Sequence, residues 1–480
     1  MENTTFLPDP ADKKSISYVV PEGVVAIGDR AFSYWEKLQS IELPESVEII
    51  GKNAFDSCGS LKEIRLPERL KSLSDYAFYG CKSLKEIVVP ENVETIETCA
   101  FDGCKSLKSI VLPNGLKKIG KLAFAGCSSL KSFDVPESVR SIGELAFFEC
   151  SKLKSIAIPE KVEEIEVGAF CFCPKMKSIA VSENNSRYRS IDGVLFAKDG
   201  KTLYRYPEGL INEVYVVPEG VETIGLRAFE YDCAFYKVVL PEGVKKIEKY
   251  AFSSCQTLAE IVLPKSLEAI GNDAFKGCLS LTSIAIPENV EEIGRFAFDR
   301  CPLLLSIDVA ENNARYRSID GVLFAKDGKT LVRRPGGLAN EVYVVPENVE
   351  RISERAFTFC SSLKKIVLSN GVKTLENETF SNCSSLTEVV FSEGLEKIGD
   401  AAFEECSSLK EIVVPQGVKI IGDEAFSGCL SLTKIVIPES VKEIGYDAFK
   451  RLDSLTIYAP KGSYAEKYAK TNTTKFEPTT

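Results

Sequence analysis

The sequence contains no histidine among its 480 residues. Histidine is the commonest general base of enzyme sites and the commonest protein ligand of metals. Its absence removes every Ser-His and Cys-His catalytic pair, and no pair of carboxylates is singled out by its position. We therefore expect no enzymatic activity, no metal site and no cofactor.

The sequence also lacks any apolar stretch approaching eighteen residues, so we expect no membrane insertion. It begins Met-Glu-Asn-Thr-Thr, without the basic and apolar regions of a signal peptide. These features predict either a cytoplasmic protein or one whose signal has been removed. The net charge of −10 argues weakly against nucleic acid as a partner.

A 23-residue repeat fills most of the chain. Each copy carries Ala, or a near equivalent, followed by Phe; successive Phe residues are 23 apart within a run, and the two steps between runs are 59. A fixed period of this size is typical of a solenoid, in which small coils stack and bury their apolar edges against one another. The repeat Phe residues are Phe32, Phe55, Phe78, Phe101, Phe124, Phe147, Phe170, Phe229, Phe252, Phe275, Phe298, Phe357, Phe380, Phe403, Phe426 and Phe449.

One coil reads roughly L-x-x-I-x-L-P-x-x-V-x-x-I-G-x-x-A-F-x-x-C. The alternation in I-x-L predicts a short strand, which the following Pro ends. The later Gly predicts a tight bend before one helical or 3-10 turn that carries Ala-Phe-x-x-Cys. We therefore expect an α/β solenoid of about eighteen coils, with one parallel strand per coil on one side and helical turns on the other.

This repeat resembles that of the BspA-like leucine-rich-repeat proteins, a 23-residue class found mostly on the surfaces of bacteria and some protozoa. The resemblance runs from about Tyr18 to the end of the chain, and the motif recurs more than a dozen times. It implies a curved leucine-rich-repeat solenoid, an extracellular or cell-surface location, and a role in adhesion or recognition without chemistry.

Two insertions interrupt the repeat, at about 182–210 and 310–338. The segment from Arg187 to Leu203 recurs unchanged from Arg315 to Leu331, which indicates an internal duplication at an offset of 128 residues. In each copy Lys-Asp-Gly separates two apolar runs, which predicts a β-hairpin in place of the helical half of one coil.

These features predict a non-repeat segment over 1–17, the solenoid over 18–449 and a C-terminal cap with its tail over 450–480. Residues 463–469 have a short helical pattern that would cover the last open coil, as solenoid ends require. The polar tail beyond Lys470 is expected to be frayed.

Thirteen of the sixteen cysteines lie three residues after a repeat Phe. This is not a metal-ligand spacing, and a buried thiol is a good small apolar filler, so we expect a core ladder of free thiols. Cys99 and the pair Cys171 and Cys173 are interpreted as departures from the ladder, either incidental buried thiols or redox-active ones. Cys233 is displaced by one position, which leaves Asp232 in the core slot.

The residues on either side of the buried Ile of each strand should point away from the core. The place after this Ile is Val in most later coils, and an exposed apolar strip can mark a contact surface, although Val is also a good strand former. Val side chains are not the aromatic anchors of tight interfaces, so the strip alone would not bind tightly. This candidate strip consists of Val216, Val239, Val262, Val344, Val367, Val390, Val413 and Val436.

Charged residues form two further columns in the first run. Stacked like charges one strand spacing apart attract a partner of opposite charge. The basic column is therefore a candidate site for an anionic ligand, such as a sulfated glycan or an acidic protein, or else a solvated edge. It consists of Lys62, Lys85, Lys108, Lys131, Lys154 and Lys177, and the acidic column of Glu45, Glu68, Glu91, Glu137 and Glu160.

Two hypotheses of function follow. In the first, the concave strand face binds another macromolecule, most readily a protein of a host or other cell surface or matrix, with Tyr204-Arg205-Tyr206 and Arg333-Arg334 as secondary contacts. In the second, the chain is a glycan-binding surface protein or a passive structural stalk. A glycan-binding face should carry clustered exposed aromatic residues, and the strand columns have few, which favours protein binding.

Overall fold

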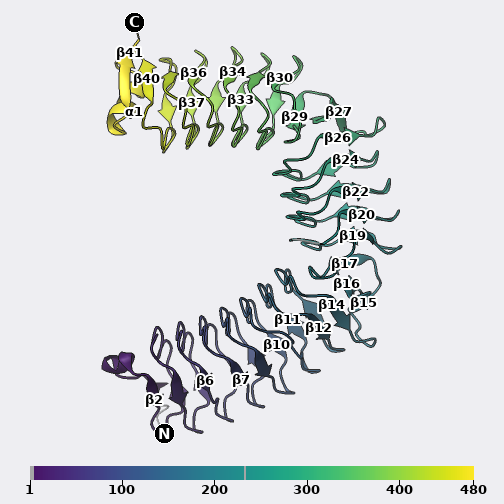
Figure 1. The fold of residues 1–480 in the computed structure, drawn as a ribbon, viewed down its shortest axis with the longest axis vertical. Coiled ribbons are helices and arrows are strands. Elements are labelled where there is room, and N and C mark those ends of the chain that lie inside the picture. Colours follow the sequence, from purple (N-terminus) through teal and green to yellow (C-terminus); the bar gives the residue numbers. More distant parts are fainter. Residues whose placement is uncertain (1–4, 232–233, 480) are drawn as a thin grey trace. The chain divides into compact units, whose positions relative to one another are not determined.

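A computed structural model describes residues 5–231 and 234–479. The described chain forms two compact units. Its coils are stacked one after another in sequence order within each unit (Figure 1). Unit 1 contains the residues up to Glu213 together with Gly220–Phe235, and unit 2 contains Val214–Glu219 together with the residues from Tyr236 onward. Both units are built from the same stacked coils, and each is described by itself below.

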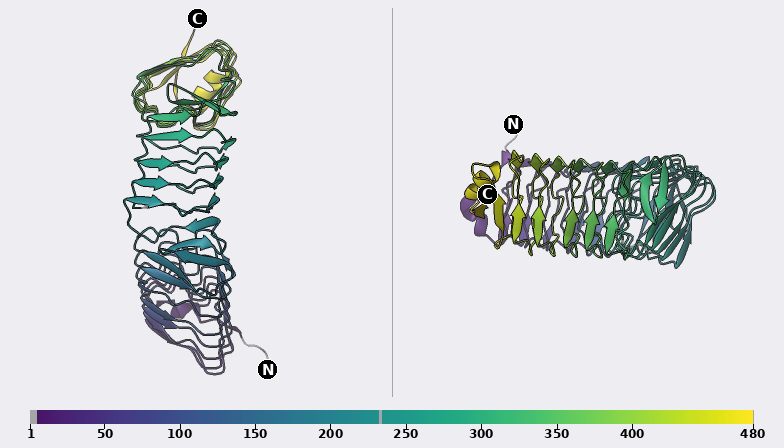
Figure 2. Two further views of the ribbon diagram at one scale, coloured as in Figure 1. Left: turned by 90° about the vertical axis from the view of Figure 1, so that its right-hand side faces the viewer. Right: turned by 90° about the horizontal axis from the view of Figure 1, so that it is seen from above.

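In most coils the first strand pairs in parallel with the first strand of a neighbouring coil, in short sheets of two to four strands (Figure 2). These strands form the surface that we call the strand face. In unit 1 they are β2 (Ser17–Val19), β4 (Ser40–Glu42), β6 (Glu63–Ile64), β7 (Glu86–Val88), β9 (Ser109–Val111), β12 (Ser155–Ile158) and β14 (Ser178–Val181). In unit 2 they are β18 (Val214–Val216), β20 (Lys237–Val239), β22 (Glu260–Val262), β24 (Ser283–Ile286), β26 (Ser306–Val309), β30 (Val342–Val344), β32 (Lys365–Val367), β34 (Glu388–Val390), β36 (Glu411–Val413), β38 (Lys434–Val436) and β40 (Thr456–Ala459).

Most coils contain a second strand, so the prediction of one strand per coil was wrong. It is only two residues long and ends at the Ile that precedes the Gly of the repeat. In unit 1 these strands are β3 (Ala26–Ile27), β5 (Ile49–Ile50), β8 (Thr95–Ile96), β10 (Lys118–Ile119), β11 (Ser141–Ile142), β13 (Glu164–Ile165) and β19 (Thr223–Ile224). In unit 2 they are β21 (Lys246–Ile247), β23 (Ala269–Ile270), β25 (Glu292–Ile293), β31 (Arg351–Ile352), β33 (Thr374–Leu375), β35 (Lys397–Ile398), β37 (Ile420–Ile421) and β39 (Glu443–Ile444).

The segment that carries Ala-Phe-x-x-Cys is a run of turns and not the expected helical turn. The residues two before and two after each repeat Phe have positive φ, as at Cys99 (φ 55°) and Gly103 (φ 74°) around Phe101. Such left-handed residues interrupt a right-handed helix. The amide of Phe101 donates to Ala123 O of the next coil at 2.8 Å. The fold is therefore almost entirely β rather than α/β, and the two helices among the described residues lie at the chain ends.

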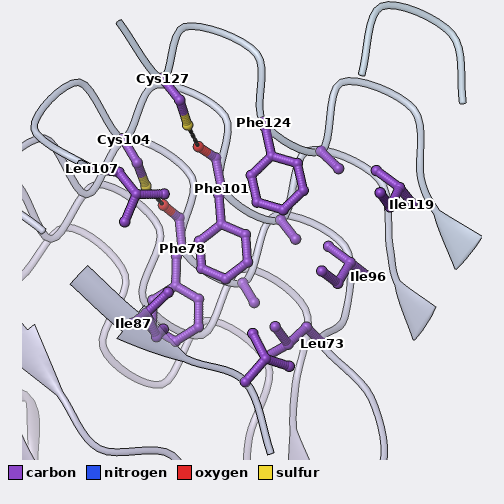
Figure 3. Close-up of a cluster of buried hydrophobic side chains, with 14 of the residues drawn as sticks. Leu73, Phe78, Ile87, Ile96, Phe101, Cys104, Leu107, Ile119, Phe124 and Cys127 are labelled. Atoms are coloured by element: carbon purple, nitrogen blue, oxygen red, sulfur yellow. Dashed lines mark hydrogen bonds between the residues drawn. The ribbon is translucent and has the colours of Figure 1, made fainter. Parts of the chain in front are cut away.

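The core is a column of stacked Phe rings flanked by a column of thiols (Figure 3). The ring centroids of Phe78 and Phe101 are 5.4 Å apart and their planes differ by 4°. Gly143 shows why Gly follows the second Ile, because an added Cβ would lie 2.6 Å from the amide nitrogen of Lys121 in the preceding coil. At this position Gly allows close stacking of coils, and its φ is not positive.

Each insertion is a three-stranded antiparallel meander. The first consists of β15 (Tyr188–Ile191), β16 (Val194–Ala197) and β17 (Thr202–Arg205), and the second of β27 (Tyr316–Ile319), β28 (Val322–Ala325) and β29 (Thr330–Arg333). The predicted hairpin at Lys-Asp-Gly is confirmed as β16–β17 and β28–β29. A second turn at Asp192-Gly193, where both residues have positive φ, adds the strand that the prediction missed.

Both chain ends add pairing to the outermost coils. The helix α1 (Tyr464–Thr471) lies at the expected place; Ser463 Oγ accepts from the amide of Glu466 at 3.3 Å, and Ala465 and Ala469 are buried. The tail beyond it is not frayed as expected, because β41 (Lys475–Pro478) pairs with β40. At the other end, β1 (Thr5–Phe6) pairs with β3, and a 3-10 helix, η1 (Pro10–Lys14), follows.

Candidate interaction surfaces

The eight valines of the predicted strip all lie on the strand face of unit 2. Val216, Val239 and Val262 are direct register partners in β18–β20–β22, and Val344, Val367 and Val390 are register partners in β30–β32–β34. Val413 pairs with Val436 in β36–β38, and Tyr458 and Glu477 continue this column. The strands therefore bring the predicted residues into straight columns, which Ala285 and Asp308 interrupt between the two main runs.

The strip alternates between exposed and half-buried valines. Val344 and Val413 are 61% and 64% exposed, whereas Val239, Val367 and Val436 are half-buried. Each half-buried Val follows a strand Lys that is paired with a Glu of a neighbouring strand: Lys237–Glu260 at 2.6 Å, Lys365–Glu388 at 2.6 Å and Lys434–Glu411 at 3.3 Å. The apolar strip is thus bordered by a column of neutralised charge.

The basic column of unit 1 is present as predicted, and all six lysines are exposed. Their backbones are linked from coil to coil, as where the amide of Lys108 donates to Lys85 O at 2.8 Å. Within the described residues, none of the six ammonium groups lies within 4.0 Å of a carboxylate. Lys62 Nζ instead donates to Gln39 Oε1 at 2.8 Å.

The acidic column has a structural role of its own. Its five carboxylates are exposed. Glu45 accepts a hydrogen bond from the amide of Glu68 at 3.2 Å, and Glu91 accepts from the amide of Asn114 at 3.3 Å. These bonds join successive coils where the chain leaves the strand face.

A groove that sequence reasoning did not identify crosses β4, β6, β7 and β9 in unit 1. Its volume is about 680 Å³. Four glutamates and Arg65 share its wall with Val88 and Val111. The strand face of unit 1 is therefore acidic and hollowed, whereas that of unit 2 is a Val column between paired charges.

The secondary contacts predicted in the insertions are wrong, with one exception. Arg205, Tyr206, Arg333 and Arg334 are buried, and Tyr204 alone of these residues is exposed. Tyr206 and Arg334 each stand 23 residues before a repeat Phe and occupy its core slot, which explains their burial. Aligning the insertions on the Phe period would have revealed this.

Two arginines beside each meander, one buried and one half-buried, are neutralised by carboxylates from different positions in the two copies. In unit 1, Arg205 pairs with Glu208, and Arg227 pairs with Glu230 at 2.6 Å. In unit 2 the positions of these two glutamates hold Gly336 and Thr358. Asp299 replaces them, at 3.6 Å from both Arg333 and Arg355. An unpaired buried charge is costly, so both copies supply a compensating carboxylate.

Fifteen cysteines fall in the described residues; all are buried and free, which confirms the thiol ladder for that part of the chain. Cys173 belongs to the ladder, contrary to the prediction, because its Sγ donates to Phe147 O at 3.2 Å like its equivalents elsewhere. Burial raises the pKa of Cys58 to about 12 and the pKa of Cys99 and Cys171 to about 11. Cys233 and Asp232 lie outside the described residues.

Cys360 differs from the other ladder thiols. Its Sγ is 3.9 Å from Arg334 O and Pro335 O, whereas the ladder bonds to Phe carbonyls, such as Cys383 to Phe357, are 3.0–3.3 Å long. Burial raises the pKa of Cys360, but a hydrogen bond with Cys383 and the guanidinium groups of Arg334 and Arg333 outweigh burial and hold this pKa below the ordinary thiol value. A buried cation thus takes the place of the Phe ring beside this thiol.

Within residues 5–231 and 234–479, no group of three or more Cys, Asp or Glu side chains is arranged to hold a metal ion. No helix there is long and apolar enough to cross a membrane.

Comparison with solved structures finds leucine-rich-repeat proteins of bacteria. One from Eubacterium ventriosum is 26% identical, with a TM-score of 0.47, and the match covers 77% of this chain and 83% of that one. A leucine-rich cell surface protein from Faecalibacterium prausnitzii is also 26% identical, with a TM-score of 0.46 and coverage of 95% and 90%. The pneumococcal vaccine antigen PcpA is 20% identical, with a TM-score of 0.44 and coverage of 98% and 91%. No curated protein matches this chain.

The family comparison matches most of the repeat region. The model for the BspA type leucine-rich repeat region matches six times, over residues 11–108, 71–198, 218–329 and 340–456. These ranges contain most of the stacked coils, the Phe and Cys columns and the first two strands of each meander. The chain therefore belongs to the BspA-type leucine-rich repeat family.

Proposed function

We propose that this chain is a non-enzymatic recognition or adhesion protein that binds another protein through the strand face of unit 2. The observation that carries the proposal is the register of the Val column, in which Val344, Val367 and Val390 are direct neighbours on adjacent strands. Apolar side chains held in a straight row on a rigid sheet offer a contact surface that needs little ordering on binding.

The border of the strip supports a protein partner. The Lys–Glu pairs beside the valines are already neutralised, so this face does not select a strongly charged ligand. A surface with an apolar centre and a polar rim resembles a protein–protein interface. The extracellular or cell-surface location implied by the family is part of the proposal, with a cytoplasmic location as the alternative.

The test is an affinity capture with matched variants of the full chain. Val344→Asp/Val390→Asp/Val413→Asp changes three exposed valines of unit 2, and Val88→Asp/Val111→Asp changes two exposed valines on the strand face of unit 1. A protein retained by the parent and by the unit 1 variant, but lost from the unit 2 variant, supports the proposal. Equal retention by all three proteins contradicts it.

A glycan-binding function remains the second candidate because of one pair of aromatic residues. Tyr76 and Tyr79 are exposed on the turn segment of unit 1, with ring centroids 5.8 Å apart. They lie away from the strand face, so glycan binding there should survive the Val variants and be lost in Tyr76→Ala/Tyr79→Ala.

A further inference from the structure

Unit 1 contains an apolar cleft beside its meander, away from the strand face. Its volume is about 130 Å³, and Ala169, Phe170 and Leu195 form its buried walls. Three large apolar side chains stand at its rim, and each is substantially exposed: Val167 is 41% exposed, Tyr204 44% and Leu226 39%. An apolar cavity of roughly 150 Å³ holds one benzene ring, so this cleft matches a single ring in size.

The duplication supplies an internal comparison for this cleft. The corresponding space in unit 2 has a volume of only about 40 Å³. Ile165, Leu195 and Arg227 of the first copy recur as Ile293, Leu323 and Arg355 in the second. The first tyrosine of each meander makes an equivalent hydrogen bond to the preceding coil. Tyr188 Oη accepts from the amide of Ile165 at 2.9 Å, and Tyr316 Oη accepts from the amide of Ile293 at 3.0 Å. The two clefts therefore share one framework.

The copies differ in what fills the framework. Position 168 is Gly in unit 1, and its equivalent in unit 2 is Phe296. The ring of Phe296 lies against the guanidinium of Arg355, with 4.3 Å from Arg355 Cζ to the ring centroid. Gly168 contributes no ring, and its conformation, with φ of 69°, is close to that of Phe296, with φ of 59°. In unit 2 the chain thus supplies its own aromatic occupant.

The residues at the rim of the cleft also differ between the two copies, and those of unit 2 cover the space that is open in unit 1. Val167 and Leu226 of unit 1 correspond to Arg295 and Glu354 of unit 2, which form an ion pair with each other. Arg295 Cζ is 5.2 Å from the Phe296 centroid, so this pair covers the ring. In unit 1 both positions are apolar and exposed, and Tyr204 stands where unit 2 has Val332. Exposed tyrosine and neighbouring arginine are side chains enriched at protein-binding hot spots.

The arginines that line the unit 1 cleft favour a neutral ligand, because each is already paired with a carboxylate. Arg205 and Arg227 line the cleft, but Glu208 and Glu230 already pair with them. An arginine in an ion pair can still stack on an aromatic face, as Arg355 does while paired with Glu378 at 2.6 Å. An anionic ligand would gain little here, whereas a ring gains both apolar burial and contact with Arg227.

We propose that the unit 1 cleft binds a phenylalanine side chain presented by a partner protein, in the place that Phe296 fills within unit 2. The occupant is a side chain because the equivalent ring reaches its site from a backbone at the surface of the coil. This site is independent of the Val strip, so its failure would leave the strand-face proposal intact.

The test measures binding of a capped pentapeptide, Ser-Gly-Phe-Gly-Ser, to the full chain by ligand-observed NMR. The control peptide is Ser-Gly-Ala-Gly-Ser, which lacks only the ring. We expect saturable binding of the Phe peptide and none of the Ala peptide. Val167→Arg/Leu226→Glu installs the ion pair of unit 2 at two exposed positions and should weaken binding at least tenfold. Gly168→Phe should abolish binding. Its added Cβ would lie 2.8 Å from Leu145 Cδ2, the end of a flexible side chain, and 3.5 Å from Cys171 Sγ.

A gain of binding provides the complementary test if Gly168→Phe fails to fold. Arg295→Val/Phe296→Gly/Glu354→Leu removes both the ring and the ion pair that covers it, so it should open the second cleft and raise the stoichiometry from one peptide per chain to two. Binding that is unchanged by Val167→Arg/Leu226→Glu would overturn the proposal. Binding of fluorobenzene without binding of the Phe peptide would also overturn it and would assign the cleft to a small free aromatic molecule.

Discussion

Cys104 Sγ donates a hydrogen bond to the carbonyl oxygen of Phe78 in the preceding coil, at 3.2 Å (Figure 3). The same carbonyl accepts from the amide of Cys81 in its own coil, also at 3.2 Å. Each Phe carbonyl of the ladder therefore uses both of its lone pairs, and the thiol is a directional bond between coils as well as an apolar filler. This explains why Cys, rather than Ala, recurs at this place.

Cys104→Ala should destabilise unit 1 by about 1–2 kcal/mol, because it removes this bond and leaves a small void in a fully buried site. Cys104→Ser keeps a hydrogen-bond donor, but the C–O bond is shorter than the C–S bond and the hydroxyl is more polar than the thiol. We therefore expect a loss of stability of similar size. Urea unfolding followed by circular dichroism measures both changes. Ser83→Ala, at a half-buried position near the same column, should cost less than either.

The described cysteines should resist alkylation in the native protein at pH 8. All fifteen are buried, and burial holds the pKa of most of them above the ordinary thiol value, as for Cys58 and Cys99. Alkylation requires both access and a thiolate. Mass spectrometry after iodoacetamide treatment should find these cysteines modified only when denaturant is present. Rapid labelling of Cys99 or Cys171 in native protein would contradict this and support a redox role for them.

The repeat period predicted the first strand, the stacking of apolar coils and the thiol ladder, because a 23-residue register repeats one physical environment many times. It did not predict the second strand, which spans two residues and is too short for any alternation to be visible, as at Thr95–Ile96. Its hydrogen bonds depend on the neighbouring coil rather than on local sequence.

The turn segment was mispredicted for a related reason. Leu122 and Leu145 both adopt φ of 55°, in a region where sequence rules expect Gly or Asn. Hydrogen bonds between coils, such as that from the amide of Leu122 to Glu144 O at 2.9 Å, hold the conformation that propensity opposes. The unit 1 cleft was missed because it depends on a difference between copies, Gly168 against Phe296, at a position outside the repeated apolar pattern.

Arg334→Tyr should stabilise unit 2 by about 1–3 kcal/mol, because replacing a buried charge by a fitting neutral group commonly does so. Arg334 is fully buried and donates to the carbonyls of Leu338 and Asn340, at 3.1 and 3.0 Å. Tyr206 solves the same problem in unit 1, where its hydroxyl donates to Leu210 O at 2.9 Å. Thermal unfolding measures the change.

The reverse exchange provides the control for this prediction. Tyr206→Arg should destabilise unit 1, because the new guanidinium would enter a core slot shaped for a ring. Loss of the Arg334 charge should also raise the pKa of Cys360, so the ultraviolet absorbance of its thiolate should develop at a higher pH in Arg334→Tyr than in the parent. Destabilisation by Arg334→Tyr would show that its carbonyl bonds outweigh the cost of burying the charge.

Asp102→Asn should stabilise unit 1 at pH 7.5 by about 1 kcal/mol, a value reduced for solvent screening because the carboxyl is only half-buried. Burial, helped by the charge of Glu149 and opposed by a hydrogen bond from Cys99, raises the pKa of Asp102 to about 6. Protonated Asp102 therefore contributes stability that is complete below about pH 4 and is lost as the pH rises through 6. Urea midpoints should differ between the parent and Asp102→Asn at pH 7.5 and converge at pH 4. Asp134→Asn, at an exposed carboxylate, should show no such convergence, and an equal gain from Asp102→Asn at both pH values would exclude ionisation as the cause.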